Sequence, residues 1–377
     1  MIYLDYSATT PVSEKLIDLY VSISNNYIGN ANSKHFLGKK SCDLLEYATL
    51  DIAKHFNCHS KEIIFTSGAS EANTMAIMGT IESLGNKGKH IITSKLEHKS
   101  VLDAMNHLVR LGYSVDYVNI LPNGMIDLID FENKLSNDTI LVSICGVNSE
   151  FGFIQPLEKI RKIIDNKNIK CFFHSDLTQA LGKIKIDLSV VDLASFSSHK
   201  IYAPGGCGIL YKKRTIQIGK LIYGSSHNSI YRGGTPVLPL IVTFAKAIEI
   251  MQENLVCNFC KCEKLKKLLI QGLSKYPIRI NSNELCVPHI VNFSLLEYSN
   301  KLFVSRLSDE GVCLSTNSAC CGDYDESIVL NEITNNNKKI SKTSLRLSIS
   351  HLTTEEEIYE FLRIFDLIWN DLKIGKG

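Results

Sequence analysis

Short apolar runs alternate with longer segments of helical periodicity over the first two thirds of the chain. Runs of four or five residues rich in β-branched and aromatic side chains predict strands. They span residues 62–66, 90–93, 114–118, 140–144, 170–174 and 208–211. Between several of them, hydrophobic residues recur at helical spacing, as at residues 71–84, 99–111 and 157–166. This alternation predicts an α/β domain with a largely parallel sheet.

The pattern changes after about residue 250. The elements predicted there are a long helix at 243–276, a strand at 289–293, a helix at 299–310, a polar loop at 335–339, a strand at 344–348 and a closing helix at 354–372. We interpret this part as a smaller α+β domain, joined by the N-terminal dozen residues. The expected division is a large domain at 13–250 and a small domain formed by 1–12 and 251–377.

Composition excludes several classes of protein. The chain has 377 residues, and 45% of them are hydrophobic, which is enough for a sizeable core. A net charge of +2 gives no overall attraction to nucleic acid or membranes, and no apolar run approaches the length of a membrane span. The N-terminus shows no secretory signal. We therefore expect a cytoplasmic protein that does not bind membranes or, directly, nucleic acid.

The twelve cysteines are scattered along the chain rather than crowded into a small framework. In a reducing cytosol this distribution favours free thiols over disulfides. Cys257, Cys260 and Cys262 have a spacing that suggests metal ligands, but they fall in a predicted helix. No second pair of cysteines or histidines nearby completes a set of four ligands. We expect ordinary surface and core thiols there, and no metal.

The segment at residues 195–200 carries the most distinctive chemistry. It reads Ser-Phe-Ser-Ser-His-Lys and follows a β-rich apolar run at residues 190–194. A lysine amine forms Schiff bases with carbonyl compounds, and pyridoxal phosphate (PLP) is the common biological aldehyde of this kind. Lys200 is therefore a candidate cofactor lysine. The alternative is a surface lysine at the end of a strand.

Other polar residues also follow predicted strands, where ligands of open parallel sheets bind. These are residues 66–70, Glu97, His98, Asn148, Asp176 and 197–200. Residues 66–71 join a strand to a helix, so the free N–H groups near Ala69 and Ser70 suit a phosphate. An ordinary helix cap at Ser67 or Ser70 is the alternative.

Asp176 ends a very apolar strand, and a buried carboxylate needs a cation or a hydrogen-bond donor. The protonated pyridine nitrogen of PLP would be such a partner, with Gln179 donating to the phenolic oxygen of the ring. Alternatively, Asp176 caps the following helix. His98 would stack on the flat ring and shuttle protons, although a lone histidine is more often structural.

Two further candidates lie near the C-terminus. Residues 315–324 form a predicted loop of small polar residues that contains Cys320 and Cys321. A loop thiolate can attack a bound substrate and carry a group away; the alternative is two inert thiols. Arg346 lies in a predicted strand between apolar neighbours. It would clamp a substrate carboxylate or form a structural salt bridge.

In this order along the chain, these segments resemble the cysteine desulfurases, the NifS/IscS-like branch of the class-V, fold-type-I PLP enzymes. The similarity covers nearly the whole chain. It is carried by residues 3–12 (YLDYSATTPV), 29–35, 65–73, 197–200, 344–348 and 353–358. The resemblance implies a homodimer. Each subunit would have a large domain around a mainly parallel seven-stranded sheet and a smaller α+β domain.

The resemblance also implies a role for each candidate residue. Lys200 would hold PLP, His98 would stack on its ring as an acid and base, and Asp176 and Gln179 would contact the pyridine nitrogen and phenolic oxygen. The phosphate would contact Ala69, Ser70, Ser197 and His199, with Thr235 reaching in from a second subunit. Asn148 and Arg346 match the region around the cofactor and the substrate carboxylate.

The nucleophile implied by the resemblance is Cys320. It would take sulfur from L-cysteine as a persulfide, release alanine and pass the sulfur to an acceptor protein. Iron–sulfur assembly, tRNA thiolation and DNA phosphorothioation are the pathways we consider for that acceptor.

The chain departs from the family pattern at several places. These are Tyr6-Ser7, residues 148–150 (Asn-Ser-Glu), 203–206 (Ala-Pro-Gly-Gly), 228–231 and the extra Cys321. The departures affect substrate-binding details and the partner more than the reaction. Two other hypotheses stay open. One is a selenocysteine lyase or aminotransferase-like activity, and the other is a non-catalytic scaffold in a sulfur-transfer complex.

Overall fold

The apolar runs of the first two thirds form a buried central sheet in the computed structural model, which describes residues 1–224, 229–316 and 327–374. Within this part of the chain the sheet has seven strands in the order β2-β8-β7-β6-β5-β3-β4. Their bounds are β2 (Ile63–Thr66), β3 (His90–Ser94), β4 (Ser114–Val118), β5 (Thr139–Ser143), β6 (Phe172–Asp176), β7 (Leu193–Ser197) and β8 (Gly208–Lys212).

Strand β8 is antiparallel to both β2 and β7, and the other neighbouring pairs are parallel. The prediction of a mainly parallel sheet is therefore confirmed. Gly208 begins β8 where a Cβ atom would lie 2.5 Å from the backbone carbon of Gly68. Only glycine allows this close approach between the β8 strand and the turn that follows β2.

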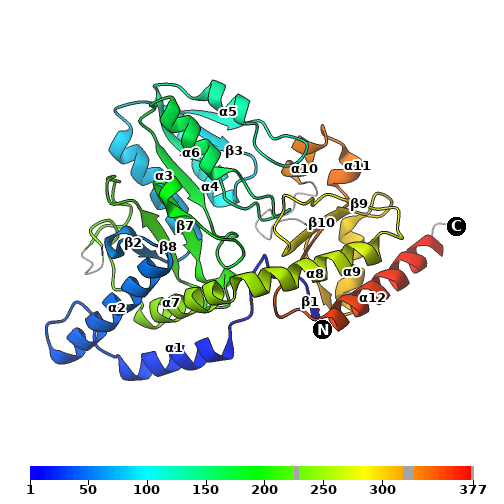
Figure 1. Cartoon of the computed structure of the whole chain (residues 1–377), viewed down its shortest axis with the longest axis horizontal. Helices are drawn as coiled ribbons and strands as arrows, with labels where there is room; N and C mark the ends of the chain where they lie inside the picture. The colour runs from blue at the N-terminus through cyan, green and yellow to red at the C-terminus, as the bar shows by residue number, and fades with distance from the viewer. Residues whose placement is uncertain (225–228, 317–326, 375–377) are drawn as a thin grey trace.

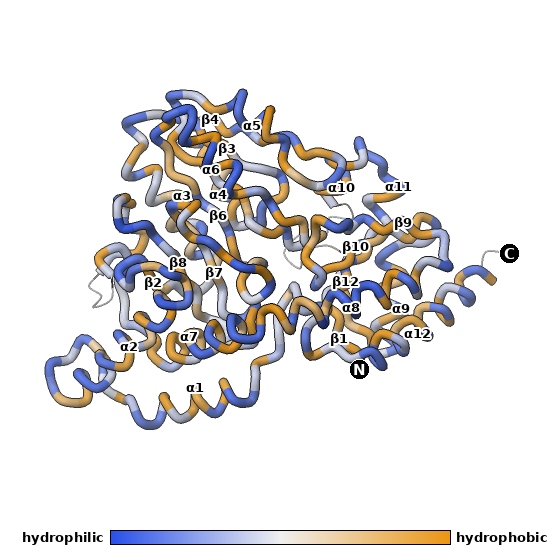
Figure 2. Tube along the Cα trace, viewed as in Figure 1, coloured by the Kyte–Doolittle hydropathy of each residue, from blue (hydrophilic) through white to orange (hydrophobic). Residues whose placement is uncertain are grey.

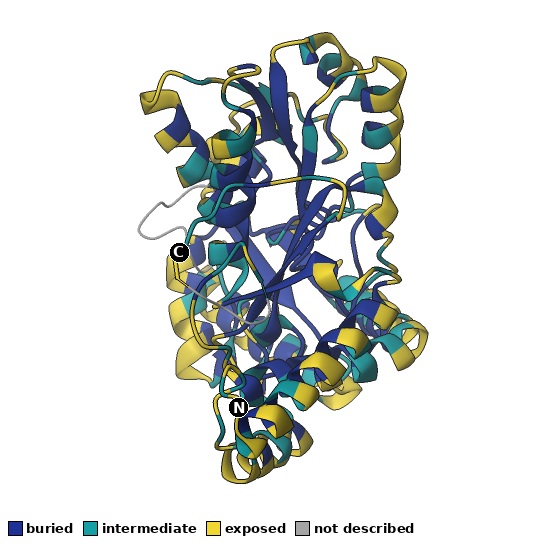
Figure 3. Ribbon diagram, turned by 90° about the vertical axis from the view of Figure 1, so that its left-hand side faces the viewer, coloured by how far each residue is buried: buried dark blue, intermediate teal, exposed yellow. Residues whose placement is uncertain are grey.

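Helices cover both faces of the sheet, with their exposed sides outward (Figures 1 and 3). They are α1 (Glu14–Asn26), α2 (Phe36–His55), α3 (Ala69–Leu84), α4 (Lys99–Arg110), α5 (Leu128–Lys134), α6 (Leu157–Asn166) and α7 (Leu238–Glu253). Hydrophobic and hydrophilic positions alternate along the outer helices, as Figure 2 shows. Among the described helices, none combines the length and apolarity needed to cross a bilayer.

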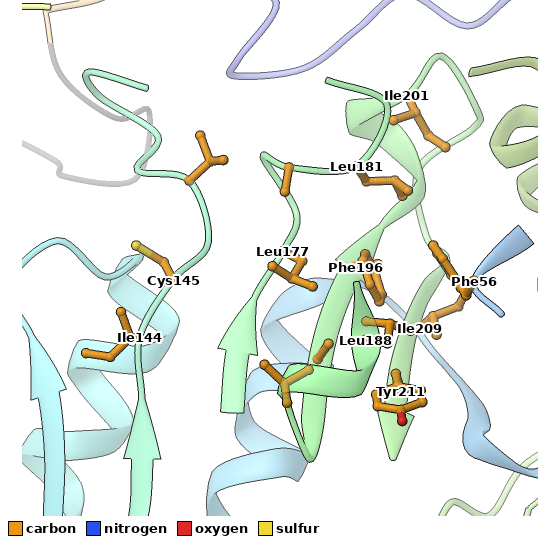
Figure 4. Close-up of a cluster of buried hydrophobic side chains, with 14 of the residues drawn as sticks. Phe56, Ile144, Cys145, Leu177, Leu181, Leu188, Phe196, Ile201, Ile209 and Tyr211 are labelled. Atoms are coloured by element: carbon orange, nitrogen blue, oxygen red, sulfur yellow. The ribbon is translucent and has the colours of Figure 1, made fainter. Parts of the chain in front are cut away.

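The main hydrophobic core packs α2 and α7 against the sheet. Phe196 of β7 stacks on Phe56, with ring centroids 4.8 Å apart; Figure 4 shows both rings beside Ile209. These side chains are at most 5% exposed. Because β7 is anchored in this way, the segment that follows it and carries Lys200 starts from a rigid point.

The last third of the chain builds a second, smaller group of elements. A three-stranded sheet has the order β12-β10-β9, and β1 pairs in parallel with β11. The elements are β1 (Ile2–Tyr3), α8 (Leu255–Leu273), β9 (Arg279–Ile280), β10 (Ile290–Ser294), α9 (Asn300–Asp309), β11 (Val312–Cys313), α10 (Ile328–Ile333), α11 (Lys338–Ser341), β12 (Ser344–Ser348) and α12 (Glu355–Ile374). A separate core joins Leu4 to Leu265, Phe303 and Phe365.

Three boundary predictions were wrong. The helix predicted over 243–276 is two helices, because the chain leaves helical geometry at Asn254, whose side-chain nitrogen donates to Ile250 O. The polar loop at 335–339 contains the start of α11. The run at 190–194 is strand only from Leu193, because residues Leu188–Val190 form a 3₁₀ turn that the Asp187 side chain caps.

Candidate active site

A cavity of about 390 Å³ lies where the carboxyl ends of the parallel strands meet the small C-terminal sheet. Its wall comes mainly from the turns after β2, β3, β5, β6 and β7. The predicted residues that line it are Ala69, Ser70, His98, Asp176, Gln179, Ser197, His199, Lys200 and Arg346. The structure thus brings together residues that are up to 277 positions apart, counting from Ala69 to Arg346.

Lys200 ends a short 3₁₀ helix, Ser198–Lys200, that directly follows β7. Its Nζ atom donates to the backbone oxygens of Ser7 at 2.8 Å and Ala8 at 2.5 Å. The Ser198 hydroxyl donates to Pro204 O at 2.6 Å and holds the turn in place. A primary amine is therefore fixed at the cavity wall by carbonyl groups of the N-terminal segment.

Asp176 ends β6 and is 7% exposed. Its Oδ2 atom accepts a hydrogen bond from Asn73 Nδ2 at 2.8 Å, and its Oδ1 atom accepts one from Thr178 N at 2.9 Å. Gln179 follows closely, and its Nε2 atom donates to Ser7 O at 2.9 Å. Each carboxylate oxygen already has one neutral donor, and the remaining lone pairs are available to a ligand in the cavity.

His98 caps the N-terminus of α4. Its Nδ1 atom accepts a hydrogen bond from Ser100 N at 3.2 Å, and the ring lines the cavity. Burial lowers the pKa of His98, while the nearby Asp176 carboxylate raises it to a smaller extent. The net shift is downward, so the imidazole is neutral near pH 7.

The N-terminus of α3 contributes the backbone N–H groups at Ala69 and Ser70. Such a terminus favours an anion through its free donors and its dipole. His199 lies on the same cavity wall. Its pKa falls to about 4, first because of burial and then because of the Lys200 charge, so this ring is also neutral.

Glu71 places a carboxylate near this helix start, and Arg232 neutralises it. Arg232 Nε lies 2.9 Å from Glu71 Oε1, and Ser67 N donates to Glu71 Oε2 at 2.7 Å. Burial alone would raise the pKa of Glu71, but these hydrogen bonds hold it below its ordinary value. The ion pair therefore removes the repulsion that an anion at α3 would otherwise meet.

Two predicted residues, Asn148 and Thr235, are described by the structure and do not line the cavity. Asn148 is 2% exposed, and its side chain is occupied by Leu96 O and by the backbone N–H groups of Glu150 and Phe151. Thr235 is exposed and does not line the cavity. Cys320, the predicted nucleophile, lies outside the described residues, as does Cys321.

Arg346 lies in β12 and is 1% exposed, with its side chain at the cavity. Its Nη2 atom pairs with Asp5 Oδ1 at 2.7 Å, and its Nη1 atom donates to Ser149 O at 3.3 Å. Within the described part of the chain, its Nε atom has no hydrogen-bond partner. The arginine therefore forms a structural salt bridge, and each of its two Nη atoms has a second hydrogen that can donate to a ligand.

Comparison with known proteins places this site in a family. The sequence model of the family described as Aminotransferase class-V matches residues 2–361. The cysteine desulfurase IscS of Buchnera aphidicola subsp. Acyrthosiphon pisum (strain 5A) is 37% identical over 374 residues, which cover 96% of this chain and 91% of the relative.

This chain belongs to the cysteine desulfurase family of class-V aminotransferases.

Solved structures agree with this family and fold, and both predictions are confirmed. A NifS-like protein superposes with a TM-score of 0.92 at 32% identity, covering 97% of this chain and 99% of that protein. The protein SspA, solved in complex with cysteine, has a TM-score of 0.82 at 28% identity and covers 94% of this chain and 100% of its own.

Several cavity residues of this desulfurase family member were missed by sequence reasoning. Ser7 and Ala8 contribute backbone oxygens to Lys200, and Cys145, which Figure 4 labels next to Ile144, lines the cavity. Asn73 lies behind the wall as the donor to Asp176. The N-terminal motif was a signal for Ser7 and Ala8. No sequence signal pointed to a backbone role for them, and the matched segment 65–73 contains Asn73 without indicating its contact with Asp176.

Replacing Arg346 by methionine in this family member is expected to lower the free energy of unfolding by about 3 kcal/mol. The change leaves the Asp5 carboxylate beside an apolar side chain, without its guanidinium. Urea unfolding of the two proteins measures the difference. Arg306→Met is the control, because Arg306 and Asp371 form an exposed pair, and its loss costs about 1 kcal/mol or less. Equal effects of the two substitutions would contradict a structural role for Arg346.

Glu97 gives this family member a pH-dependent stability. It directly precedes His98 and is buried, and burial, assisted by the Asp176 charge, raises its pKa from 4.5 to about 8. Between these values the folded chain keeps a proton that the unfolded chain loses. Its contribution to stability therefore falls as pH rises from about 4.5 to about 8.

The isosteric Glu97→Gln variant removes this titration. Its gain in stability relative to the parent should increase between about pH 5 and about pH 8. Urea midpoints at both pH values measure the trend. A difference between the two proteins that does not change with pH would show that Glu97 keeps an ordinary pKa.

Proposed function

We propose that this chain is a PLP-dependent cysteine desulfurase, which removes sulfur from L-cysteine, releases alanine and carries the sulfur as a persulfide on Cys320. One observation carries the proposal. The Lys200 amine, the Asp176 carboxylate and the start of α3 line a single cavity, in a chain similar over nearly its full length to a desulfurase. A related structure in complex with cysteine supports cysteine as the substrate.

The residues present fit PLP. A cavity of about 390 Å³ suits a small phosphorylated ring. Lys200 is placed to hold its aldehyde, Asp176 its pyridine nitrogen, and Ala69, Ser70, Ser197 and His199 its phosphate. Gln179 lines the cavity, and its Nε2 atom, which donates one hydrogen to Ser7 O, keeps a second hydrogen for the phenolic oxygen of the ring. When bound, PLP supplies an electron-withdrawing ring that stabilises negative charge at the substrate α-carbon.

The chain's own residues bind the substrate and move its protons. Arg346 orients the cysteine carboxylate through the second hydrogens of Nη1 and Nη2, since Ser149 and Asp5 use only one hydrogen of each. Lys200 takes up the α-carbon proton as an unprotonated amine. His98, neutral because burial lowers its pKa, lines the cavity and is placed to donate a hydrogen bond from Nε2 to the substrate or cofactor.

Cys320 acts as the nucleophile. Its thiolate attacks the sulfur of cysteine, so that an S–S bond forms, the substrate C–S bond breaks, and the carbon fragment takes up a proton and leaves as alanine. The persulfide then passes to an acceptor protein. Iron–sulfur assembly, tRNA thiolation and DNA phosphorothioation are the candidate destinations.

Mass spectrometry after incubation with L-cysteine tests this function. Alanine should form, and the peptide that contains Cys320 should gain one sulfur atom. Repeating the experiment with Cys321→Ser separates the two thiols, which are adjacent. Turnover of selenocysteine alone, or transfer of the amino group to a keto acid, would replace the proposal with one of those activities.

We also propose that the chain acts as a homodimer. Large apolar side chains are exposed on α1, on α2, at Tyr223 and in the segment 229–237; they include Ile17, Val21, Phe36, Tyr47, Tyr223, Ile230 and Val237. Exposed apolar side chains favour association when a second copy of the chain covers them. Thr235 belongs to this segment and lies outside its own cavity, which suits a contact with the phosphate site of a second copy. Sedimentation equilibrium measures the assembly.

We propose a cytoplasmic location because buried cysteines of this chain are not oxidised to disulfides. Cys145, Cys207 and Cys262 are buried and form no disulfide. A persulfide carrier also requires a reduced thiol at Cys320 before each turnover.

A further inference from the structure

A chain of hydrogen bonds connects Asp176 to His98 behind the cavity wall. Asn73 Nδ2 donates to Asp176 Oδ2 at 2.8 Å and to Ser100 Oγ at 2.9 Å. Ser100 Oγ in turn lies 2.9 Å from His98 Nδ1. The linking residues come from α3 and α4. Asn73 is fully buried, and neither it nor Ser100 lines the cavity.

The direction of each hydrogen bond follows from the chemistry of the groups. An amide nitrogen only donates, so Ser100 Oγ accepts from Asn73, and its own hydrogen is free to point at His98 Nδ1. Ser100 N is also a donor only, and it points at the same ring nitrogen at 3.2 Å. Nδ1 therefore carries no proton, and the neutral ring keeps its hydrogen on Nε2.

Asparagine meets the demands of this position. Its NH₂ group has two hydrogens, one for each acceptor, whereas an aspartate would offer none and would repel Asp176. Asn73 Oδ1 is buried without a hydrogen-bond partner in the described ranges. The two donor contacts therefore set the orientation of the amide, although the amide oxygen is left without a hydrogen bond.

We propose that Asn73, acting through Ser100, is a positioning residue that fixes the Asp176 carboxylate and the Nε2–H tautomer of His98 together. The role rests on the proposed function, since those two side chains would contact the cofactor. Without Asn73, the Ser100 hydroxyl loses the donor that sets its direction, and Asp176 Oδ2 loses its hydrogen bond. His98 Nδ1 would then keep only the longer hydrogen bond from Ser100 N, at 3.2 Å, and the second tautomer would become accessible.

Nitrogen NMR of ¹⁵N-histidine-labelled protein, recorded with and without added PLP, tests the tautomer directly. The His98 signals are assigned by their loss in His98→Gln. We expect the parent to show an unprotonated Nδ1, and Asn73→Leu and Ser100→Ala to show a mixture of tautomers. Thr80→Val is the matched control, because Thr80 is a fully buried polar residue of the same helix outside this network.

Kinetics supply the second readout. Asn73→Leu and Ser100→Ala should each lower kcat for cysteine by about tenfold, the effect of losing one or two hydrogen bonds, with KM nearly unchanged. Ser100→Thr keeps the hydroxyl and should restore both kcat and the single tautomer. If both Asn73→Leu and Ser100→Ala showed only the Nε2–H tautomer, the proposal would be overturned.

The two readouts separate this proposal from the proposed function. A tautomer change in Asn73→Leu, in a protein that shows no desulfurase activity, would support the network and reject the function. Desulfurase activity in the parent, together with unchanged tautomers in the variants, would support the proposed function and reject the positioning role of Asn73.

Discussion

Replacing Cys320 by serine is expected to lower sulfide release from L-cysteine by on the order of 10³-fold or more, the scale on which loss of a nucleophile acts. A serine hydroxyl does not accept sulfur to form a persulfide, so the C–S bond has no attacking group. Sulfide release in the presence of a thiol reductant measures the loss, and visible absorption measures bound cofactor.

The adjacent thiol provides the control. Cys321→Ser should keep most of the activity, because the account assigns no step to Cys321. Both variants should keep the yellow colour of the bound cofactor, since none of the residues assigned to hold it is changed. Undiminished sulfide release by Cys320→Ser would remove Cys320 from the mechanism and favour the selenocysteine lyase hypothesis.

Replacing Asp176 by asparagine is expected to lower kcat by roughly 10²- to 10⁴-fold. This range corresponds to the 3–5 kcal/mol typical of removing one member of a buried charge pair. The side chain keeps its shape and can still accept from Thr178 N, but it no longer carries the charge that would keep a pyridine nitrogen protonated. Steady-state kinetics with cysteine give the size of the effect.

Asp103→Asn is the matched control for Asp176. Asp103 forms an exposed pair with Lys99 on α4 and also contributes to the electrostatic field at His98. Its replacement should change kcat less than about twofold, as expected for an exposed pair. If Asp176→Asn were as active as Asp103→Asn, the buried carboxylate would have no role in activating the cofactor.

The hydrophobic pattern predicted most helices and strands, because the apolar residues of these elements are regularly arranged along the chain. Strands such as β3 and β5 are fully buried, so they appear as uninterrupted apolar runs, and α6 has clear helical spacing. The break at Asn254 was missed because apolar spacing continues across it without proline or glycine. Only local backbone geometry separates α7 from α8.

The candidate site was predictable where it depends on strand ends. Asp176, Ser197 and the start of α3 converge because parallel strands end at one edge of a sheet. Side-chain direction was not predictable in this way. Asn148 follows β5 but turns into its own loop, and the Asp5–Arg346 pair joins residues 341 positions apart. Such contacts depend on how the two cores dock.

Reduction with borohydride tests the central claim most directly, that Lys200 holds the cofactor covalently. The purified chain is saturated with PLP, reduced, digested and mapped by mass spectrometry. The account predicts one reduced pyridoxyl adduct, on the peptide that contains Lys200. The absence of an adduct at Lys200, or an adduct confined to another lysine such as the nearby buried Lys183, would contradict it.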